Sequence, residues 1–226
     1  MKNLGAKHKN LDQKVYLIIK EMITNRKLLP GDKIPQENLA HELGISRTPL
    51  VSALKYMEKE KLVEALPRRG FFVRQFSTQE MISIFELREV LEGLAARRAA
   101  ICISDNQINK LTGFFKQFST PIDHAQYKAY AREDQQFHTF VTEIGSKEFL
   151  KSILQSYNII SFSYQVISSE GLVRPPDETI HEHLALIDAI CSRSPDDAEA
   201  LMRQHFIRTS RFLKNEIEKE AVAVNH

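Results

Sequence analysis

The chain has 226 residues, 42% of them hydrophobic and 27% charged, which is enough for one large or two small domains with apolar cores. Two cysteines exclude a disulfide framework. The polar, basic first ten residues and the lack of any apolar run of 18 residues argue against a signal peptide and a membrane span. We therefore expect a cytoplasmic protein that makes no membrane contact, with both cysteines as buried free thiols in apolar helices.

The net charge of +2 is distributed unevenly along the chain. Residues 1–75 contain 15 Lys and Arg against 8 Asp and Glu, whereas residues 76–226 contain 16 against 21. A basic first third followed by an acidic remainder indicates two modules. The basic module suits a polyanionic partner such as nucleic acid.

The first module, residues 10–75, begins with two helical patterns. Apolar residues recur at helical spacing over 15–23, and a second, shorter helix is expected over 36–43. Gly44 follows directly and supplies the positive φ that the tight turn of a helix-turn-helix needs.

A third helix and a hairpin complete this module. Ser46 or Thr48 is expected to cap the helix, and extended runs over 61–66 and 71–74 flank a Pro/Gly turn. A helix-turn-helix followed by a hairpin is a winged helix. Its third helix enters the DNA major groove, and its wing reaches the backbone or the minor groove.

Several short runs stand at fixed spacings in this module: 29–34, 39–40, 43–49, 53–54 and 67–73. Together they resemble the GntR family of bacterial transcription regulators. The resemblance implies that Arg47 and Thr48 contact DNA and that Gly70 of the wing approaches the backbone. With the start of the helix and the wing tip included, the predicted DNA-binding residues are Ser46, Arg47, Thr48, Arg68, Arg69 and Gly70.

Two alternatives and one departure apply to this assignment. Arg47 can be a solvated cation at the start of a helix, and wing arginines are often only loosely docked. The family usually places an arginine and a glutamate where this chain has Val51 and Ser52. Because a bidentate Arg–guanine contact contributes about 1–3 kcal/mol of discrimination, the operator is expected to differ from those of relatives.

The second module, residues 77–219, is expected to be all helical. A capping box at 77–80 starts a helix directly after the wing, so the linker is only about three residues long. The predicted apolar face of that helix includes Leu87. No strand pattern and no internal repeat occurs, which predicts a helical bundle. The further helices are expected at about 105–118, 123–144, 147–168, 177–191 and 195–219.

One carboxylate and three imidazoles are candidates for a metal site in this bundle. Asp134 and His138 lie four residues apart on one helical face, and His183 and His205 lie on the two last helices. Apolar neighbours such as Leu184 predict that these helices pack inward. An N₃O donor set suits zinc first, with nickel, iron or manganese as alternatives. The plain alternative is an Asp/His surface pair without metal.

Three patterns of the second module extend the resemblance: 133–138, 182–190 and 202–205. They resemble the effector domain, called FCD, of the FadR-type branch of the same family. The resemblance implies that Asp134, His138, His183 and His205 bind a divalent metal that anchors a small organic acid. Arg88 lies in a further matching stretch, where it can hold a ligand carboxylate, pair with Glu92 or tie the domains together.

Two details of this module remain matters of expectation. The chain has Gly145-Ser146 where the family often has Gly-Asn, so the pocket near that turn is expected to differ from that of relatives. Six helices in a short domain favour the compact, VanR-like subgroup.

The sequence therefore predicts a mainly α protein, with an N-terminal winged helix-turn-helix and a C-terminal all-α helical bundle effector domain. We expect a homodimeric repressor that binds an inverted-repeat DNA operator and responds to a small carboxylate. A metal-dependent hydrolase is a second hypothesis, but no further residue is placed as a general base, so the chain is expected not to be an enzyme. An architectural DNA binder without a ligand is the third, and only the Val51-Ser52 departure supports it.

Overall fold

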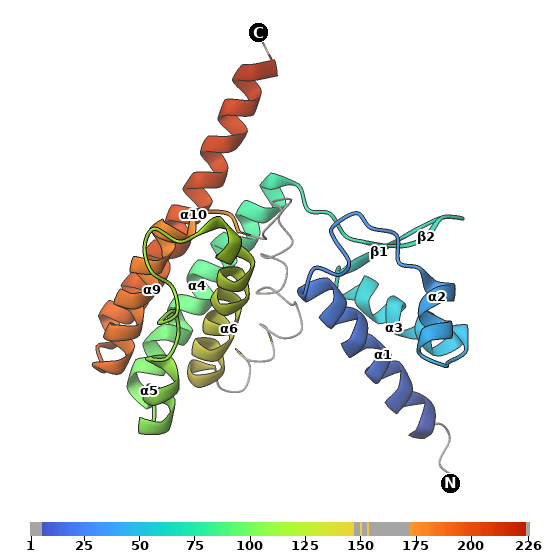
Figure 1. Cartoon of the computed structure of the whole chain (residues 1–226), viewed down its shortest axis with the longest axis horizontal. Coiled ribbons are helices and arrows are strands. Elements are labelled where there is room, and N and C mark those ends of the chain that lie inside the picture. The colour runs from blue at the N-terminus through green and yellow to red at the C-terminus, as the bar shows by residue number, and fades with distance from the viewer. Residues whose placement is uncertain (1–5, 147–149, 151–152, 154–171, 225–226) are drawn as a thin grey trace. The chain divides into compact units, whose positions relative to one another are not determined.

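In the computed structural model, the described residues are 6–146, 150, 153 and 172–224 (Figure 1). The chain divides into two compact units, Met1–Gln75 and Phe76–His226, and each is taken by itself below. The mainly α fold class is confirmed, because the one sheet among the described residues has two strands. The domain ranges 10–75 and 77–219 stay a prediction.

The first unit packs three helices around a small apolar core. Ile19, Leu50, Leu54 and Met57 have no exposed surface. These side chains come from the first and third helices, which pack against each other. The elements are α1 (Ala6–Thr24), α2 (Gln36–Glu42), α3 (Arg47–Lys59), β1 (Val63–Leu66) and β2 (Gly70–Val73).

The turn between α2 and α3 depends on one glycine. Gly44 has a φ of +62°, and its backbone N–H donates to the carbonyl of His41. Ser46 follows in extended conformation as the N-cap of α3, so it, not Thr48, precedes the helix. This arrangement leaves Arg47 as the first helical residue, at the exposed end of α3.

The wing is a two-stranded hairpin with a third segment along its edge. Val63 pairs with Val73, and Leu66 pairs with Gly70 across an antiparallel register. The segment 31–34 hydrogen-bonds to β2, with the Ile34 N–H donating to the carbonyl of Phe71. The Leu29-to-Ile34 run therefore does more than end α1, because it covers the free edge of β2.

The second unit is a helical bundle built on its first helix. The long α4 packs against α6, α9 and α10. A capping box formed by Ser77 and Glu80 starts this helix, as the sequence predicts. The described elements are α4 (Thr78–Cys102), α5 (Asp105–Leu111), the 3₁₀ turn η1 (His124–Gln126), α6 (Tyr127–Gly145), α9 (Pro176–Cys191) and α10 (Pro195–Val224).

Three predicted helices differ in extent. The helix expected over 105–118 ends at Leu111, because the chain enters turns and Phe115 takes a left-handed φ of +63°. The helix expected over 123–144 opens with η1, and the last helix continues beyond residue 219 to Val224. The helix expected over 147–168 lies outside the described residues, apart from 150 and 153.

Three expectations about burial were wrong. Leu87 and Leu184 are 52% and 44% exposed in the single chain, since both point away from the helices that α4 and α9 pack against. Both cysteines are free thiols but neither is buried: Cys102, in the last turn of α4, is exposed, and Cys191, at the end of α9, is half-buried. In the part of the chain that the structure describes, no helix is both long enough and apolar enough to cross a bilayer.

Gly145, the last residue of α6, lies directly against the backbone of α4. A Cβ at this position would lie 1.8 Å from the carbonyl oxygen of Ala95 on α4. We expect Gly145→Ala to lower the free energy of unfolding by about 1–3 kcal/mol or more, because the two helices must separate. Urea denaturation followed by circular dichroism measures this loss.

Ser146→Ala is the matched control at the next residue. Its buried hydroxyl makes no hydrogen bond within the described residues, so its removal is expected to leave stability within about 0.5 kcal/mol. Equal stability of Gly145→Ala and the wild type would show that α4 and α6 do not approach each other here.

Candidate functional site

A basic groove in the first unit brings several of the predicted DNA-binding residues together. Arg47 from α3 and Arg68, Arg69 and Gly70 from the wing line a groove of about 460 Å³, and Lys33 also lines it. Four cations around one open groove form a surface that suits a phosphate backbone. Ser46 and Thr48 do not line this groove, although both are exposed at the start of α3.

The side chains of this groove are oriented by local contacts. The Arg47 guanidinium lies 3.4 Å from the Glu37 carboxylate, but both side chains are more than 60% exposed, so this pair contributes little to stability. Arg69 lies over the ring of Phe72, 5.1 Å from its centroid. At the wing tip Arg68 and Gly70 take positive φ values of 60° and 96°, which turns the chain sharply.

The four predicted metal ligands meet in the interior of the second unit. His138 on α6, His183 on α9 and His205 on α10 each offer a nitrogen, and these three atoms lie within 4.8 Å of one another. Asp134, one turn before His138, places its Oδ1 3.2 Å from the Nε2 of His183. All three imidazoles are at least nine-tenths buried.

The Nδ1 atom of each imidazole has a hydrogen-bond partner. The Nδ1 of His138 lies 2.8 Å from Glu92 Oε2, and that of His205 lies 2.7 Å from Glu182 Oε2. The Nδ1 of His183 lies 3.0 Å from the Tyr130 hydroxyl. An ionised carboxylate only accepts hydrogen bonds, so the Nδ1 of His138 and that of His205 carry a proton, and in a neutral imidazole the lone pair then lies on Nε2.

The residues present fit a divalent transition metal. The Nε2 atoms of His138 and His183 are buried and have no hydrogen-bond partner among the described residues. Burial lowers the pKa of His183 well below its usual value and also lowers that of His205, so both imidazoles stay neutral. Neutral imidazoles that face one another with their lone pairs, beside a carboxylate, form an N₃O donor set for a cation.

Glu92 is the buried anion on which this side of the site depends. It has no exposed surface, and its Oε1 lies 2.5 Å from the Nε of Arg88. Burial alone would raise the pKa of Glu92, but the adjacent Arg88 and His138 hold it at about 2, so the carboxylate stays ionised. Arg88 also lies 4.4 Å from the ring centroid of Phe206.

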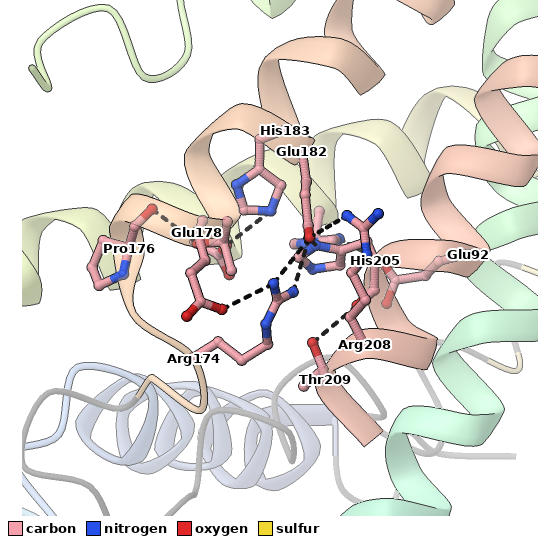
Figure 2. A network of polar contacts seen from close by, with 12 residues as sticks. Glu92, Arg174, Pro176, Glu178, Glu182, His183, His205, Arg208 and Thr209 are labelled. Atoms are coloured by element: carbon pink, nitrogen blue, oxygen red, sulfur yellow. Dashed lines mark hydrogen bonds and ion pairs between the residues drawn. The ribbon is translucent and has the colours of Figure 1, made fainter. Parts of the chain in front are cut away.

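Glu182 plays the matching role for His205, as Figure 2 shows. Arg174 forms two hydrogen bonds to it, of 2.9 and 3.0 Å, and Arg208 forms one of 2.6 Å. Arg174 also bonds Glu178 at 3.2 Å. Burial opposes ionisation of Glu182, but the hydrogen bonds from His205, Arg174 and Arg208 lower its pKa well below the usual range.

A cavity of about 40 Å³ opens beside these ligands. Asp134, His138 and His205 lie in its wall with Arg88 and Arg174. This volume has room for a few water-sized groups, since one water needs about 10–15 Å³ of such space. Arg88 pairs with Glu92, which is one of the three roles left open by the sequence, and it also lines this cavity. Its role toward a ligand carboxylate stays a prediction.

Several residues of the site were not predicted: Tyr130, Arg174 and Glu182. The sequence positions of two of them, Tyr130 and Glu182, are related to those of predicted ligands. Tyr130 precedes Asp134 by four residues and so shares its helical face. Glu182 stands next to His183, but adjacent helical residues point in different directions, and only the fold shows that Glu182 reaches His205.

Comparison with known families assigns both units. Residues 11–73 match the model described as bacterial regulatory proteins, gntR family, and residues 83–208 match the FCD domain. The chain belongs to the GntR family of bacterial transcription regulators, in the branch with an FCD domain. The predicted family is thereby confirmed, and an FCD domain agrees with the FadR-type branch, whereas the VanR-like subgroup stays a prediction.

Relatives match along most of this GntR-family chain. It is 25% identical over 202 residues to the HTH-type transcriptional repressor RspR of Escherichia coli, covering 86% of this chain and 85% of the relative. It is 25% identical over 177 residues to the Nta operon transcriptional regulator of Aminobacter aminovorans, covering 78% and 81%. These relatives are named as regulators of transcription, not as enzymes.

Solved structures show the same fold. The E. coli protein McbR/YncC superposes with a TM-score of 0.70 at 16% identity and covers 92% of this chain and 98% of its own. A GntR-type regulator from Rhodococcus sp. RHA1 gives a TM-score of 0.76 at 14% identity and covers 90% and 97%.

Removing the charge of Glu92 tests whether this buried network is a coupled unit. We expect Glu92→Gln to lower the free energy of unfolding by about 3–5 kcal/mol, because it leaves Arg88 as an uncompensated buried cation. The double variant Arg88→Met/Glu92→Leu is the control, since apolar groups of similar volume are expected to cost far less. Urea denaturation of the metal-free proteins measures both. A double variant as unstable as the single one would contradict the ion-pair explanation.

Proposed function

We propose that this transcription regulator is a sequence-specific repressor that binds an inverted-repeat operator as a homodimer. A small carboxylate bound at a metal site in its FCD domain would control it. The observation that carries the proposal is the buried triad of His138, His183 and His205, whose lone pairs face one another beside a cavity. The repressor relative RspR supports the direction of regulation.

Operator binding is supported by the groove of the first unit. The exposed start of α3 presents Ser46, Arg47 and Thr48 for base edges, and the wing presents Arg68 and Arg69 for phosphates. A helix-turn-helix monomer reads only a few base pairs, so a two-fold dimer on an inverted repeat supplies the remaining affinity.

The metal ligands we propose are Asp134, His138, His183 and His205. Zinc is the first candidate, with nickel, iron or manganese as alternatives, because the donor set is rich in imidazole and contains one carboxylate. When bound, the ion supplies a Lewis-acidic anchor for the carboxylate of an organic acid. Glu92 and Glu182 hold two of the imidazoles with their Nε2 lone pairs turned inward.

The charges around the cavity support an anionic effector only in the metal-loaded protein. Both guanidiniums that face the cavity, those of Arg88 and Arg174, are already paired with carboxylates that are at most 12% exposed. Without a cation, the acidic side chains of the network outnumber the basic ones: Glu92, Asp134, Glu178 and Glu182 against Arg88, Arg174 and Arg208. An anion is therefore expected to bind after the metal, with Arg88 as the polar group that the sequence assigns to the effector pocket.

Only a few residues of the polypeptide separate the wing from the helix that carries Arg88 and Glu92. The helix that carries Arg88 and Glu92 begins at Thr78, and β2 of the wing ends at Val73. A link this short favours transmission of a change in α4 to the wing. An effector that binds two arrangements of the dimer with different affinity would shift DNA binding by a coupling of about 1–3 kcal/mol.

Replacing Arg47 tests the DNA-binding surface. The operator is first selected from a random DNA pool at near-physiological salt, and a two-fold symmetric motif is expected. Arg47→Ala is then expected to weaken operator binding by about 5- to 150-fold, as the loss of one base contact does. Fluorescence anisotropy measures the affinity.

Lys219→Ala is the matched control, because it removes one cation from an exposed site on α10 in the other unit. It should bind the operator as the wild type does. A pool that enriches no motif, with binding that only follows salt, would favour the architectural reading.

Replacing His183 tests the metal site. The wild type is expected to bind one Zn²⁺ per chain, and His183→Ala is expected to bind it at least about 100-fold more weakly, since even outer-shell changes cost 10- to 100-fold. Competition with a chromophoric chelator measures this affinity. His181→Ala is the control, because that histidine is exposed two residues away on the same helix.

The same variants then test regulation. A change in operator affinity on addition of small carboxylates, beginning with acetate, is expected in the Zn²⁺-loaded wild type and in His181→Ala but not in His183→Ala. A full response by His183→Ala would refute the metal-anchored mechanism.

A further inference from the structure

The imidazole of His183 is held differently from the other two. His138 and His205 each face a carboxylate, but His183 faces the hydroxyl of Tyr130, which is fully buried. A hydroxyl both donates and accepts, so this contact alone does not set which ring nitrogen carries the proton.

The group that decides the tautomer of His183 is a main-chain carbonyl, two hydrogen bonds beyond Tyr130. The Tyr130 hydroxyl lies 2.8 Å from Thr179 Oγ1, and Thr179 Oγ1 donates to the carbonyl of Pro176 at 3.3 Å. Figure 2 labels Pro176 at the start of α9, on the side of His183 that faces away from His205. The four groups form a continuous chain from a main-chain carbonyl to a buried ring nitrogen.

The carbonyl at one end of this hydrogen-bond chain determines which group donates in each of its hydrogen bonds. A carbonyl oxygen only accepts, so the single proton of Thr179 is committed to Pro176. Tyr130 must then donate to Thr179, which leaves its oxygen as the acceptor for His183. The Nδ1 of His183 therefore carries the proton, and its Nε2 carries the lone pair.

We infer that Tyr130 and Thr179 are positioning residues that set the tautomer of His183 and so make its Nε2 available as a metal ligand. The inference rests on the metal site proposed above. The Nε2 of His183 lies 3.2 Å from Asp134 Oδ1, but this contact does not have the geometry of a hydrogen bond, so Asp134 does not compete for the proton of His183.

Uncharged hydroxyl groups suit the Nδ1 side of His183 for an electrostatic reason. Asp134 already lies beside His183, and Glu92 and Glu182 are ionised nearby. A third carboxylate behind His183 would add another buried negative charge, which is costly without its own partner. The hydroxyl chain orients the imidazole in the same way as a carboxylate would, without adding charge.

The direct test is the tautomer itself, measured in metal-free full-length protein labelled with ¹⁵N-histidine. Long-range ¹H–¹⁵N correlation spectra distinguish the Nδ1–H from the Nε2–H form, and the loss of one signal set in His183→Ala assigns the residue. His183 is expected as Nδ1–H in the wild type and to shift toward Nε2–H in Thr179→Val, because Tyr130 then turns its proton to His183. An Nε2–H form in the wild type would overturn the inference.

Metal affinity gives a second readout, by chelator competition with Zn²⁺. Tyr130→Phe and Thr179→Val are each expected to weaken binding by about 10- to 100-fold, the range for outer-shell partners of a metal-bound histidine. Thr179→Ser keeps the hydroxyl and is expected to bind as the wild type does. Tyr127→Phe removes a hydroxyl from the half-buried ring one turn earlier on α6 and is the matched control.

These results separate the inference from the proposed function. Unchanged affinity in Tyr130→Phe and Thr179→Val, in a wild type that binds Zn²⁺, would refute the positioning role but keep the metal site. A wild type that binds no Zn²⁺ would refute the proposed metal site. The tautomer measurement would still show which groups donate in the hydrogen-bond chain from Pro176 to His183. Equal losses in Thr179→Ser and Thr179→Val would show that packing, not the hydroxyl, matters.

Discussion

The second unit is organised around three buried imidazoles that turn the same ring nitrogen toward one point. Buried polar atoms without partners destabilise a fold, so this arrangement has to be held in place by other interactions. Each histidine comes from a different helix, α6, α9 or α10, and each is fixed by a group behind it. A bound cation would satisfy the lone pairs that the fold leaves facing one another.

The long helix α4 supplies the frame for this centre. Glu92 reaches from it to His138, and the carbonyl of Ala95 lies against Gly145 at the end of α6. The same helix carries Arg88, which neutralises Glu92 and faces the cavity. Helix position, ligand orientation and cavity charge therefore depend on a few neighbouring residues of one element.

Basic neighbours keep two carboxylates of this site ionised. Glu92 stays ionised because Arg88 and His138 adjoin it, and Glu182 stays ionised because Arg174, Arg208 and His205 hydrogen-bond to it. Each of these ionised carboxylates accepts a hydrogen bond from the Nδ1–H of the adjacent imidazole. Burial, in contrast, lowers the pKa of His183 and of His205 and so favours the neutral form of these two imidazoles.

The sequence by itself determined the family, the mainly α class and the order of most elements. Helical periodicity, Gly44 and the capping box at Ser77 are local features, and local features can be read along the chain. The sequence also singled out Asp134, His138, His183 and His205, through a resemblance of short patterns. Only the tertiary structure decided that these four meet, because they lie on three helices whose packing depends on contacts far apart in the chain.

The hydrogen-bond partners of the imidazole Nδ1 atoms could not be predicted from the sequence. Glu92 is 46 residues from His138, and Tyr130 is 53 residues from His183, so no spacing rule connects them. The exposure of Leu87 and Leu184 was missed for a related reason, since an apolar stripe shows that a helix has a face but not which neighbour covers it. Partners of this kind are set by how helices pack against one another, which a single periodic pattern does not encode.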